Sequence, residues 1–277
     1  MAITAQEIAA LRKKTGAGIM DCKKALMEAG GDFEQAIDLL RKKGRKLCMD
    51  RAARQASEGA VFAAVSSDQQ EAFLLVLNCE TDFVARNEQF LQLGNAILAE
   101  CVAHRPDSIE TLLQLPLKDG VVQDAIMEAI GVIGEKIAIS AYETLRGTIV
   151  VPYIHTGNTL GVLVALQGAN AAQSEAVGKE IAMQIAAMHP VAVDETQVDP
   201  ALVARETAVI QEQLAQEGFT GFKAEKITQG RLHKFFQEST LLQQPFVFAQ
   251  NNKLTVGQYL QSLALTVTAF KRVQVNG

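Results

Sequence analysis

The chain contains an internal duplication, which constrains its fold more than any other feature of the sequence. Two apolar segments that start at a glycine, 59–65 and 147–153, are each followed by a polar turn and a second apolar segment, 72–78 and 160–167. A helical stretch follows in both copies, and the copies end in similar peptides, Val102-Ala103-His104-Arg105-Pro106 and Ala186-Ala187-Met188-His189-Pro190. Each copy therefore predicts a β-hairpin followed by a helix, and the pair indicates an α+β core of two lobes with antiparallel sheets.

A compact helical module precedes the duplication. Apolar residues recur at helical spacing in 4–14, 19–29 and 33–42, and glycines separate these three segments. Asp32 is placed to cap the third helix. Residues 1–46 are therefore predicted to form three helices that resemble the ubiquitin-associated (UBA) fold, and 47–58 a basic helical linker.

The remaining sequence fills out the two lobes. Lobe 1 is expected at 59–145 and includes a helix at 119–136 that runs into a strand at 137–143. Lobe 2 is expected at 146–198 and 239–277, where the alternating segment 265–275 can close a sheet. The inserted segment 199–238 starts with the N-cap pair Asp199-Pro200 and carries two amphipathic stretches joined by Gly218–Gly221. We expect a protruding antiparallel helical hairpin of coiled-coil type.

Composition limits the classes of protein that the chain can belong to. No apolar run approaches the eighteen or more residues that would suggest a membrane span, and we expect no secretory leader, since the first residues predict a helix with a polar face. The four cysteines are widely spaced without a CxxC pair, which is typical of reduced thiols in a cytoplasmic protein. Residues 1–54 hold twelve Lys/Arg and seven Asp/Glu, a net +5, and the remainder carries −10. The basic arm suits an acidic protein surface or nucleic acid, and equally a solvated helix face.

No catalytic, cofactor or metal motif emerges from the sequence. The glycines of 15–18 and the Gly178-Lys179 pair do not complete a phosphate-binding loop. The four histidines lie in separate segments without metal-ligand spacing, and His104 and His189 occupy equivalent places in the duplication, which favours a structural role at helix C-termini. No Ser or Cys lies in a nucleophile elbow. We therefore expect no enzyme, no cofactor and no bound metal.

One segment has the outline of an RNA-binding loop. Residues 130–137 contain a Gly-Val-Ile-Gly sequence similar to the GXXG loop of KH domains. The two central residues are apolar, and Glu135 would place negative charge beside RNA phosphates. A helix end packed closely on the next strand explains the glycines better, so nucleic acid is not an expected partner.

An acid and an aromatic ring stand together where a predicted buried strand ends. The apolar run 73–77 is followed directly by Asn78-Cys79-Glu80-Thr81-Asp82-Phe83-Val84-Ala85-Arg86. In one interpretation Thr81 or Asp82 only caps the next helix and Phe83 packs back on the core. In the other, Asp82 and Phe83 protrude and enter another molecule.

These segments together resemble the bacterial elongation factor Ts family. The peptide 15–26, Thr-Gly-Ala-Gly-Ile-Met-Asp-Cys-Lys-Lys-Ala-Leu, resembles its N-terminal signature, and 78–86 resembles its second signature. Weaker matches follow in order along the chain at 133–137, 153–155, 160–163, 242–246 and 255–258.

The resemblance implies a guanine-nucleotide exchange factor for elongation factor Tu. Such a factor binds the Tu–GDP complex, disturbs its magnesium and phosphate site and promotes GDP release, after which GTP rebinds during translation elongation. It implies that Thr81, Asp82, Phe83 and Val84 enter the nucleotide-binding domain of Tu. It also implies contacts from Met20 and Lys23 of the helical module to that domain, and from His155 and Gly157 of lobe 2 to the third domain of Tu.

Two other functions compete with this reading. The UBA-like module suggests a protein-binding adaptor, which would bind a partner without accelerating nucleotide release. An RNA-binding protein would instead show RNA affinity that falls steeply with salt.

Overall fold

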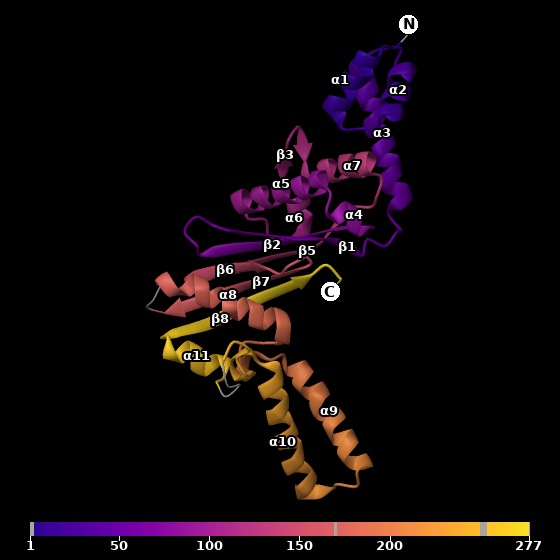
Figure 1. Cartoon of the computed structure of the whole chain (residues 1–277). Helices are drawn as coiled ribbons and strands as arrows, with labels where there is room; N and C mark the ends of the chain where they lie inside the picture. Colours follow the sequence, from indigo (N-terminus) through magenta and orange to yellow (C-terminus); the bar gives the residue numbers. More distant parts are fainter. Residues whose placement is uncertain (1–2, 169–170, 250–253, 277) are drawn as a thin grey trace.

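The computed structural model describes residues 3–168, 171–249 and 254–276, and it shows two small antiparallel sheets stacked face to face (Figure 1). Helices cover the outer face of each sheet, so the core has four layers. A helical module lies at the N-terminal end of this stack, and a long helical hairpin projects from the opposite end. The α+β class predicted from the sequence is confirmed.

Each sheet has three strands and is built from one copy of the duplication. The first sheet has the order β1-β2-β5, with β1 at Glu58–Val65, β2 at Glu71–Cys79 and β5 at Ala138–Arg146. The second has the order β6-β7-β8, with β6 at Ile149–Ile154, β7 at Leu160–Gly168 and β8 at Leu265–Gln274. In both sheets the second strand of the predicted hairpin is central, and a strand from later in the chain pairs with its free edge.

The two sheets pack through a shared layer of aliphatic side chains. Every residue of β2 is buried, because one face of the strand meets the helices and the other meets the second sheet. The sheets approach closely at Gly161 of β7, where a Cβ atom would lie 2.6 Å from Val61 and 2.8 Å from Leu74. The buried members of this layer are Val61, Ala72, Leu74, Val76, Leu145, Val150, Leu163, Ala165, Val273 and Val275.

The outer layers are helical. Helices α5 (Glu88–His104) and α7 (Val122–Ile133) pack on the first sheet, and α8 (Ala171–Met188) and α11 (Val256–Ser262) pack on the second. Short elements connect them, namely α4 (Asp82–Ala85), α6 (Ile109–Leu113), β3 (Pro116–Leu117), β4 (Gly120–Val121), η1 (Glu195–Gln197) and η2 (Leu241–Gln243).

The N-terminal module consists of α1 (Ala5–Thr15), α2 (Ile19–Glu28) and α3 (Phe33–Arg51) around a small core of its own. The sequence predicted a third helix that ends at Lys42, before Gly44, and a separate linker. That boundary is wrong, because α3 is one continuous helix of 19 residues. Gly44 lies inside it where α3 crosses α7: a Cβ atom on Gly131 would lie 2.9 Å from the Cα atom of Gly44.

The projecting hairpin is formed by α9 (Pro200–Gln216) and α10 (Gly221–Ser239). Asp199 caps α9 by accepting a hydrogen bond from the Ala201 N–H, as the sequence predicts. The base of the hairpin is closed by a parallel bridge between Ala192 and Thr240.

Other boundaries differ modestly from the predictions. The helix expected at 119–136 is shorter, because β4 occupies its beginning and Gly134 ends it with a left-handed backbone (φ 82°). The strand expected at 137–143 continues to Arg146. Gly131 was expected to pack on the next strand, and it packs on α3 instead. The division of the chain into domains at the predicted residues stays a proposal.

Candidate functional site

The acid–phenyl pair stands on a single helical turn between β2 and α5. We call Thr81–Val84 the tip. Thr81 is the N-cap of α4, and its Oγ1 atom accepts a hydrogen bond from the Val84 N–H (3.4 Å). The Phe83 side chain is 82% exposed, and the exposed Asp82 carboxylate lies 3.4 Å from the guanidinium of Arg86. Asn87 then starts α5 by accepting from the Gln89 N–H (2.8 Å).

This geometry decides part of the choice between the two interpretations of the 78–86 segment. Thr81 does cap a helix, but Phe83 does not pack on the core, and that part of the capping interpretation is wrong. Val84 and Ala85 make the core contacts instead. Burying a phenylalanine side chain is worth about 1.5–3 kcal/mol, so an exposed ring on an ordered turn is available to a binding partner.

The carboxylate of Glu135, which follows the C-terminal end of α7, is hydrogen-bonded to the start of the tip. Glu135 Oε2 accepts hydrogen bonds from the backbone N–H groups of Glu80 (3.1 Å) and Thr81 (3.0 Å). Its Oε1 atom accepts from the Thr81 hydroxyl (2.7 Å). Both carboxylate oxygens of Glu135 thus hold Thr81, the first residue of the tip, and one of them also holds Glu80.

The Glu80 side chain points the other way, to the end of α3. It accepts from the Lys136 N–H (2.7 Å) and from the guanidinium groups of Arg51 (2.9 Å) and Arg54 (3.0 Å). The Lys136 N–H, followed by Arg54 and Arg51, lowers the pKa of Glu80 from its usual 4.5 to about 2. The Glu80 carboxylate therefore stays charged at neutral pH. The Lys136 ammonium completes the network by donating to the carbonyls of Ala52 (2.7 Å) and Arg54 (2.8 Å).

This network was not predicted from the sequence. In the sequence Glu80 stood out only as part of the 78–86 segment, and Glu135 only as an argument against RNA binding. The two residues are 55 positions apart, and no spacing rule connects them. One feature of the sequence could have pointed to the network, namely Gly134. Its left-handed backbone allows a turn between α7 and β5, and this turn places Glu135 near the end of β2.

The predicted contact residues of the helical module are also at the surface. Met20 is 64% exposed on α2, and Lys23 is exposed one turn later, while Cys22 and Leu26 face the module core. The loop that precedes α2 lies near the start of α5, which follows the tip. A Cβ atom on Gly16 would lie 3.9 Å from the side-chain Nε2 atom of Gln89.

The residues predicted in lobe 2 occupy the turn between β6 and β7. His155 and Gly157 are exposed there, Gly157 has a left-handed backbone (φ 94°), and the His155 ring is hydrogen-bonded to the Tyr153 hydroxyl (2.9 Å). The turn reaches β1, where the Val61 N–H donates to the Asn158 carbonyl (2.7 Å). Glu58, three residues before Val61, pairs with Cys79, so the turn lies roughly 10 Å along β1 from the base of the tip.

Two buried thiols of the first sheet and α5 are not suited to nucleophilic chemistry. Burial, with a further contribution from Glu135, raises the pKa of Cys79 to about 12, and burial raises that of Cys101 to about 12. Only the thiolate is a nucleophile, and these two are protonated at neutral pH.

The described residues contain no group of His, Cys, Asp and Glu that could hold a metal ion. In the part of the chain that the structure covers, no helix is both long and apolar enough to cross a membrane.

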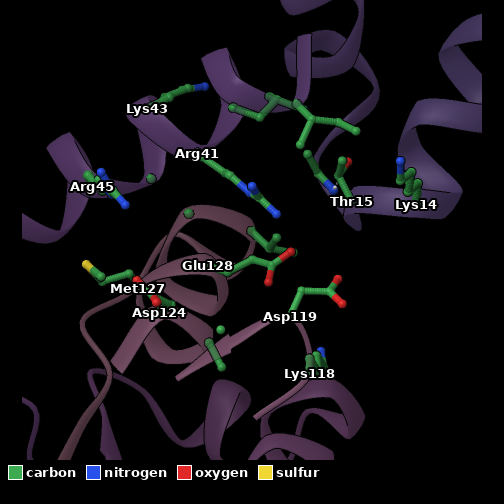
Figure 2. Close-up of a pocket in the computed structure, with 18 of the residues that line it drawn as sticks. Lys14, Thr15, Arg41, Lys43, Arg45, Lys118, Asp119, Asp124, Met127 and Glu128 are labelled. Carbon is green, nitrogen blue, oxygen red and sulfur yellow. Dashed lines mark hydrogen bonds between the residues drawn. The ribbon is translucent and has the colours of Figure 1, made fainter. Parts of the chain in front are cut away.

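A cleft of ≈ 340 Å³ separates the helical module from α7 (Figure 2). Basic side chains of α3 line one wall, and Arg41 points from there towards the wall that carries Asp119 and Glu128. Charges of both signs face each other across the cleft, and its floor is the Gly44–Gly131 crossing. The cleft lies between the helical module and lobe 1.

The fold and the site define an α+β protein that presents an ordered, solvent-exposed acid–phenyl pair beside an exposed helical surface. These are features of a class of proteins that act by contact with another macromolecule.

Comparison with known proteins identifies the family. A model of the family described as "Elongation factor TS" matches residues 80–277, more than half of the chain. The chain is 51% identical over 277 residues to a protein named Elongation factor Ts from Amoebophilus asiaticus (strain 5a2), with 99% of both chains covered. It is 46% identical over 277 residues to the Elongation factor Ts of Cytophaga hutchinsonii, again with 99% of both chains covered. It is 44% identical over 279 residues to that of Porphyromonas gingivalis, with 100% of this chain and 99% of the relative covered. The chain therefore belongs to the elongation factor Ts family, as its resemblance predicted.

Proposed function

We propose that this protein is the guanine-nucleotide exchange factor of elongation factor Tu. It binds the Tu–GDP complex, disturbs the magnesium and phosphate site and promotes GDP release, and GTP then binds the emptied Tu during translation elongation. The membership of the family supports this function, and so does the observation that carries it most directly: the tip presents Phe83 and Asp82 to solvent on an ordered turn.

Linkage explains how such a factor works without chemistry of its own. A protein that binds nucleotide-free Tu more tightly than Tu–GDP must weaken GDP binding by the same factor. The phenyl ring of Phe83 can separate packed elements of Tu, and the Asp82 carboxylate can compete for the environment of the cation. Magnesium that leaves a bound diphosphate leaves its charge less neutralised, so the nucleotide dissociates faster. The factor is therefore not an enzyme in this proposal and needs no cofactor.

The remaining surface residues extend the same interface. Thr81 and Val84 shape the tip, while Met20 and Lys23 contact the nucleotide-binding domain of Tu through the UBA-like module. His155 and Gly157 contact the third domain of Tu. These three surfaces lie on neighbouring segments, as the contacts of Gly16 and Asn158 indicate. We also propose a cytoplasmic location, which the four free thiols of the chain fit.

The experiment is stopped-flow release of fluorescent GDP from the matching Tu, with rising concentrations of the protein. We expect the wild-type chain to accelerate release, and Phe83→Ala and Asp82→Ala each to lower the maximal rate about tenfold or more, or about 1.4 kcal/mol. Thermal unfolding should be nearly unchanged, because exposed substitutions usually change stability by about 0.5 kcal/mol or less.

Phe222→Ala is the matched control. Phe222 is 81% exposed at the start of α10 on the projecting hairpin, so this variant removes an equally exposed ring far along the chain from the tip. Its release rate should equal that of the wild type. A wild-type protein that binds Tu but leaves the GDP off-rate unchanged would support the adaptor function instead. RNA affinity that falls steeply with salt would support the RNA-binding function.

A further inference from the structure

We propose that Glu80 and Glu135 are positioning residues that lock the tip to the end of α3, and that the tip and the helical module therefore meet the partner as one rigid surface. We call Glu80, Glu135, Lys136, Arg51 and Arg54 the clamp. This inference rests on the proposed function, because it concerns how the same interface is held in shape.

On the tip side, Glu135 orders a helix that cannot order itself. Helix α4 has four residues, and an isolated turn of this length is not stable in water. The Thr81 hydroxyl donates to Glu135 (2.7 Å), which leaves its oxygen oriented to accept from the Val84 N–H. The backbone N–H groups of Glu80 and Thr81 also end on Glu135. Loss of this carboxylate would leave three donors unpaired and the N-cap free to rotate.

On the module side, the clamp holds the last turn of α3. The final carbonyls of a helix have no partner within it and carry partial negative charge. The Lys136 ammonium binds the carbonyl of Ala52, the C-cap of α3, and that of Arg54, two residues beyond it. The Glu80 carboxylate binds the side chain of Arg51, the last residue of α3, and that of Arg54 in the segment that follows the helix. The tip and the end of α3 therefore share one set of charge-assisted hydrogen bonds.

The clamp is partly shielded from solvent. The side chains of Glu80 and Arg51 are 18% and 19% exposed, whereas those of Glu143 on β5 and its partner Lys271, an ion pair of comparable length, are 38% and 44% exposed. Exposed pairs contribute little, and partial burial makes a hydrogen-bonded pair both stronger and more costly to break.

A second fixed point sets the direction of α3. Gly44 meets Gly131 of α7 in the middle of the helix, at backbone-to-backbone distance. The clamp then holds its C-terminal end seven residues later, at Arg51. A helix held at two points has a defined axis, and the module at its other end, with Met20 and Lys23, has a defined place relative to Phe83.

The consequence for binding is preorganisation. Two contact surfaces that are already fixed relative to each other lose less freedom on association than two surfaces joined by a mobile link. The clamp therefore acts on the bound state through the residues it positions, without touching the partner.

The test compares Glu135→Ala, Glu135→Gln and Glu80→Gln with the control Glu143→Gln, which removes a carboxylate from the exposed pair on β5. Fluorescent GDP release from Tu is measured against protein concentration to separate the maximal rate from the half-saturating concentration. We expect Glu135→Ala and Glu80→Gln to lower the maximal rate about fivefold or more and to raise the half-saturating concentration. Glu143→Gln should match the wild type in both.

A spectroscopic readout examines the tip in the free protein. The chain contains no tryptophan, so Phe83→Trp introduces a single fluorophore at the tip. Time-resolved anisotropy should show a larger amplitude of nanosecond motion when Glu135→Ala or Glu135→Gln is added, and no change with Glu143→Gln. If Glu135→Ala fails to fold, Glu135→Gln decides, since it keeps the size of the side chain and one acceptor oxygen.

The outcomes distinguish the two proposals. A wild-type protein that does not accelerate GDP release overturns the proposed function, while the anisotropy still reports whether the clamp orders the tip. Normal acceleration with clamp variants that equal Glu143→Gln in rate overturns the positioning role, whether or not the tip becomes more mobile. Unchanged anisotropy in folded clamp variants overturns it as well.

Discussion

Phe83 and Phe90 lie seven residues apart, yet one ring is among the most exposed in the described structure and the other is fully buried. Asn87 separates them, because it ends the segment that follows α4 and starts α5 in a new direction. Val84 and Ala85 occupy the core side of the short turn, which leaves the Phe83 ring only the outward direction. The exposure of Phe83 is thus a result of local backbone geometry and not of a lack of apolar space.

Glu80 should make the free energy of unfolding depend on pH. Its pKa is lowered from 4.5 to about 2 in the folded protein, so its contribution is fully present above about pH 4.5 and is lost as the pH falls towards 2. We expect Glu80→Gln to cost about 1.5–3 kcal/mol at pH 7, the usual range for hydrogen bonds to a charged group. The difference from the wild type should shrink between pH 5 and pH 3. Urea unfolding at several pH values measures it.

Glu143→Gln serves as the control for this titration, because an exposed pair contributes about 1 kcal/mol or less. A Glu80→Gln difference that stays constant from pH 7 to pH 3 would contradict the assignment of a charged Glu80 in the clamp.

At this scale the sequence predicted the exposed residues better than the supporting ones. Thr81 or Asp82 was recognisable as a capping residue, because their types and their place after an apolar run follow a local rule, and Thr81 is the one that caps α4. The support from Glu135 was not predictable, since it depends on how α7, β2 and α3 come together across more than fifty residues.

Among the elements, the contact of α5 with β1 depends on a missing side chain. Gly94 of α5 lies directly under the ring of Phe62, and a Cβ atom there would overlap the ring. Gly94→Ala should destabilise the protein by about 1–3 kcal/mol, because overpacking forces the helix away from the sheet. Chemical denaturation of the purified variant measures the change.

Gly230→Ala is the matched substitution in α10, where a Cβ atom would meet nothing within 4 Å. It should stabilise the protein, or its hairpin, by about 0.5–1 kcal/mol, since alanine favours a helix. Equal effects of the two variants would show that helix propensity, and not the Phe62 contact, governs Gly94.

The elements also show where sequence patterns reach their limit. The continuous apolar run of β2 predicted a buried strand, and the structure confirms it. The third helix was predicted to end at Lys42, before Gly44, and glycine does cost a helix about 1 kcal/mol relative to alanine. The close crossing with Gly131 offsets that cost, and a long-range contact of this kind leaves no trace in local periodicity.

Across the whole molecule, burial is distributed unevenly. Strand β2 is enclosed by helices on one side and a second sheet on the other, whereas α9 and α10 bury few side chains between them, mainly Ile210, Leu214 and Thr228. Regions with few buried contacts open without global unfolding.

We therefore expect the backbone amides of α9 and α10 to exchange with deuterium about 100-fold or more faster than those of β2. Hydrogen exchange with mass spectrometry measures both segments in one experiment, and β7, the central strand of the second sheet, is the internal reference for the stack. Equal protection of the hairpin and β2 would mean that the chain opens only as a single unit.

The duplication predicted both lobes, because each copy carries its own hairpin and helix. The face-to-face stacking of the two sheets could not be predicted in the same way. A continuous apolar strand indicates burial on both faces, but it does not say which element covers the second face. The match of Gly161 to Val61 and Leu74 becomes visible only in the structure.

The Gly44–Gly131 crossing is the point about which α3 would tilt. From Gly44 to the start of α3 at Phe33 is eleven residues, or roughly 17 Å of helix at about 1.5 Å per residue. A tilt of about 10° at that point would displace the far end by roughly 3 Å, close to the length of a hydrogen bond. A single methyl group added at Gly131, where a Cβ atom would lie 2.9 Å from the Cα atom of Gly44, would thus be amplified along α3 into a misplacement of the whole N-terminal module.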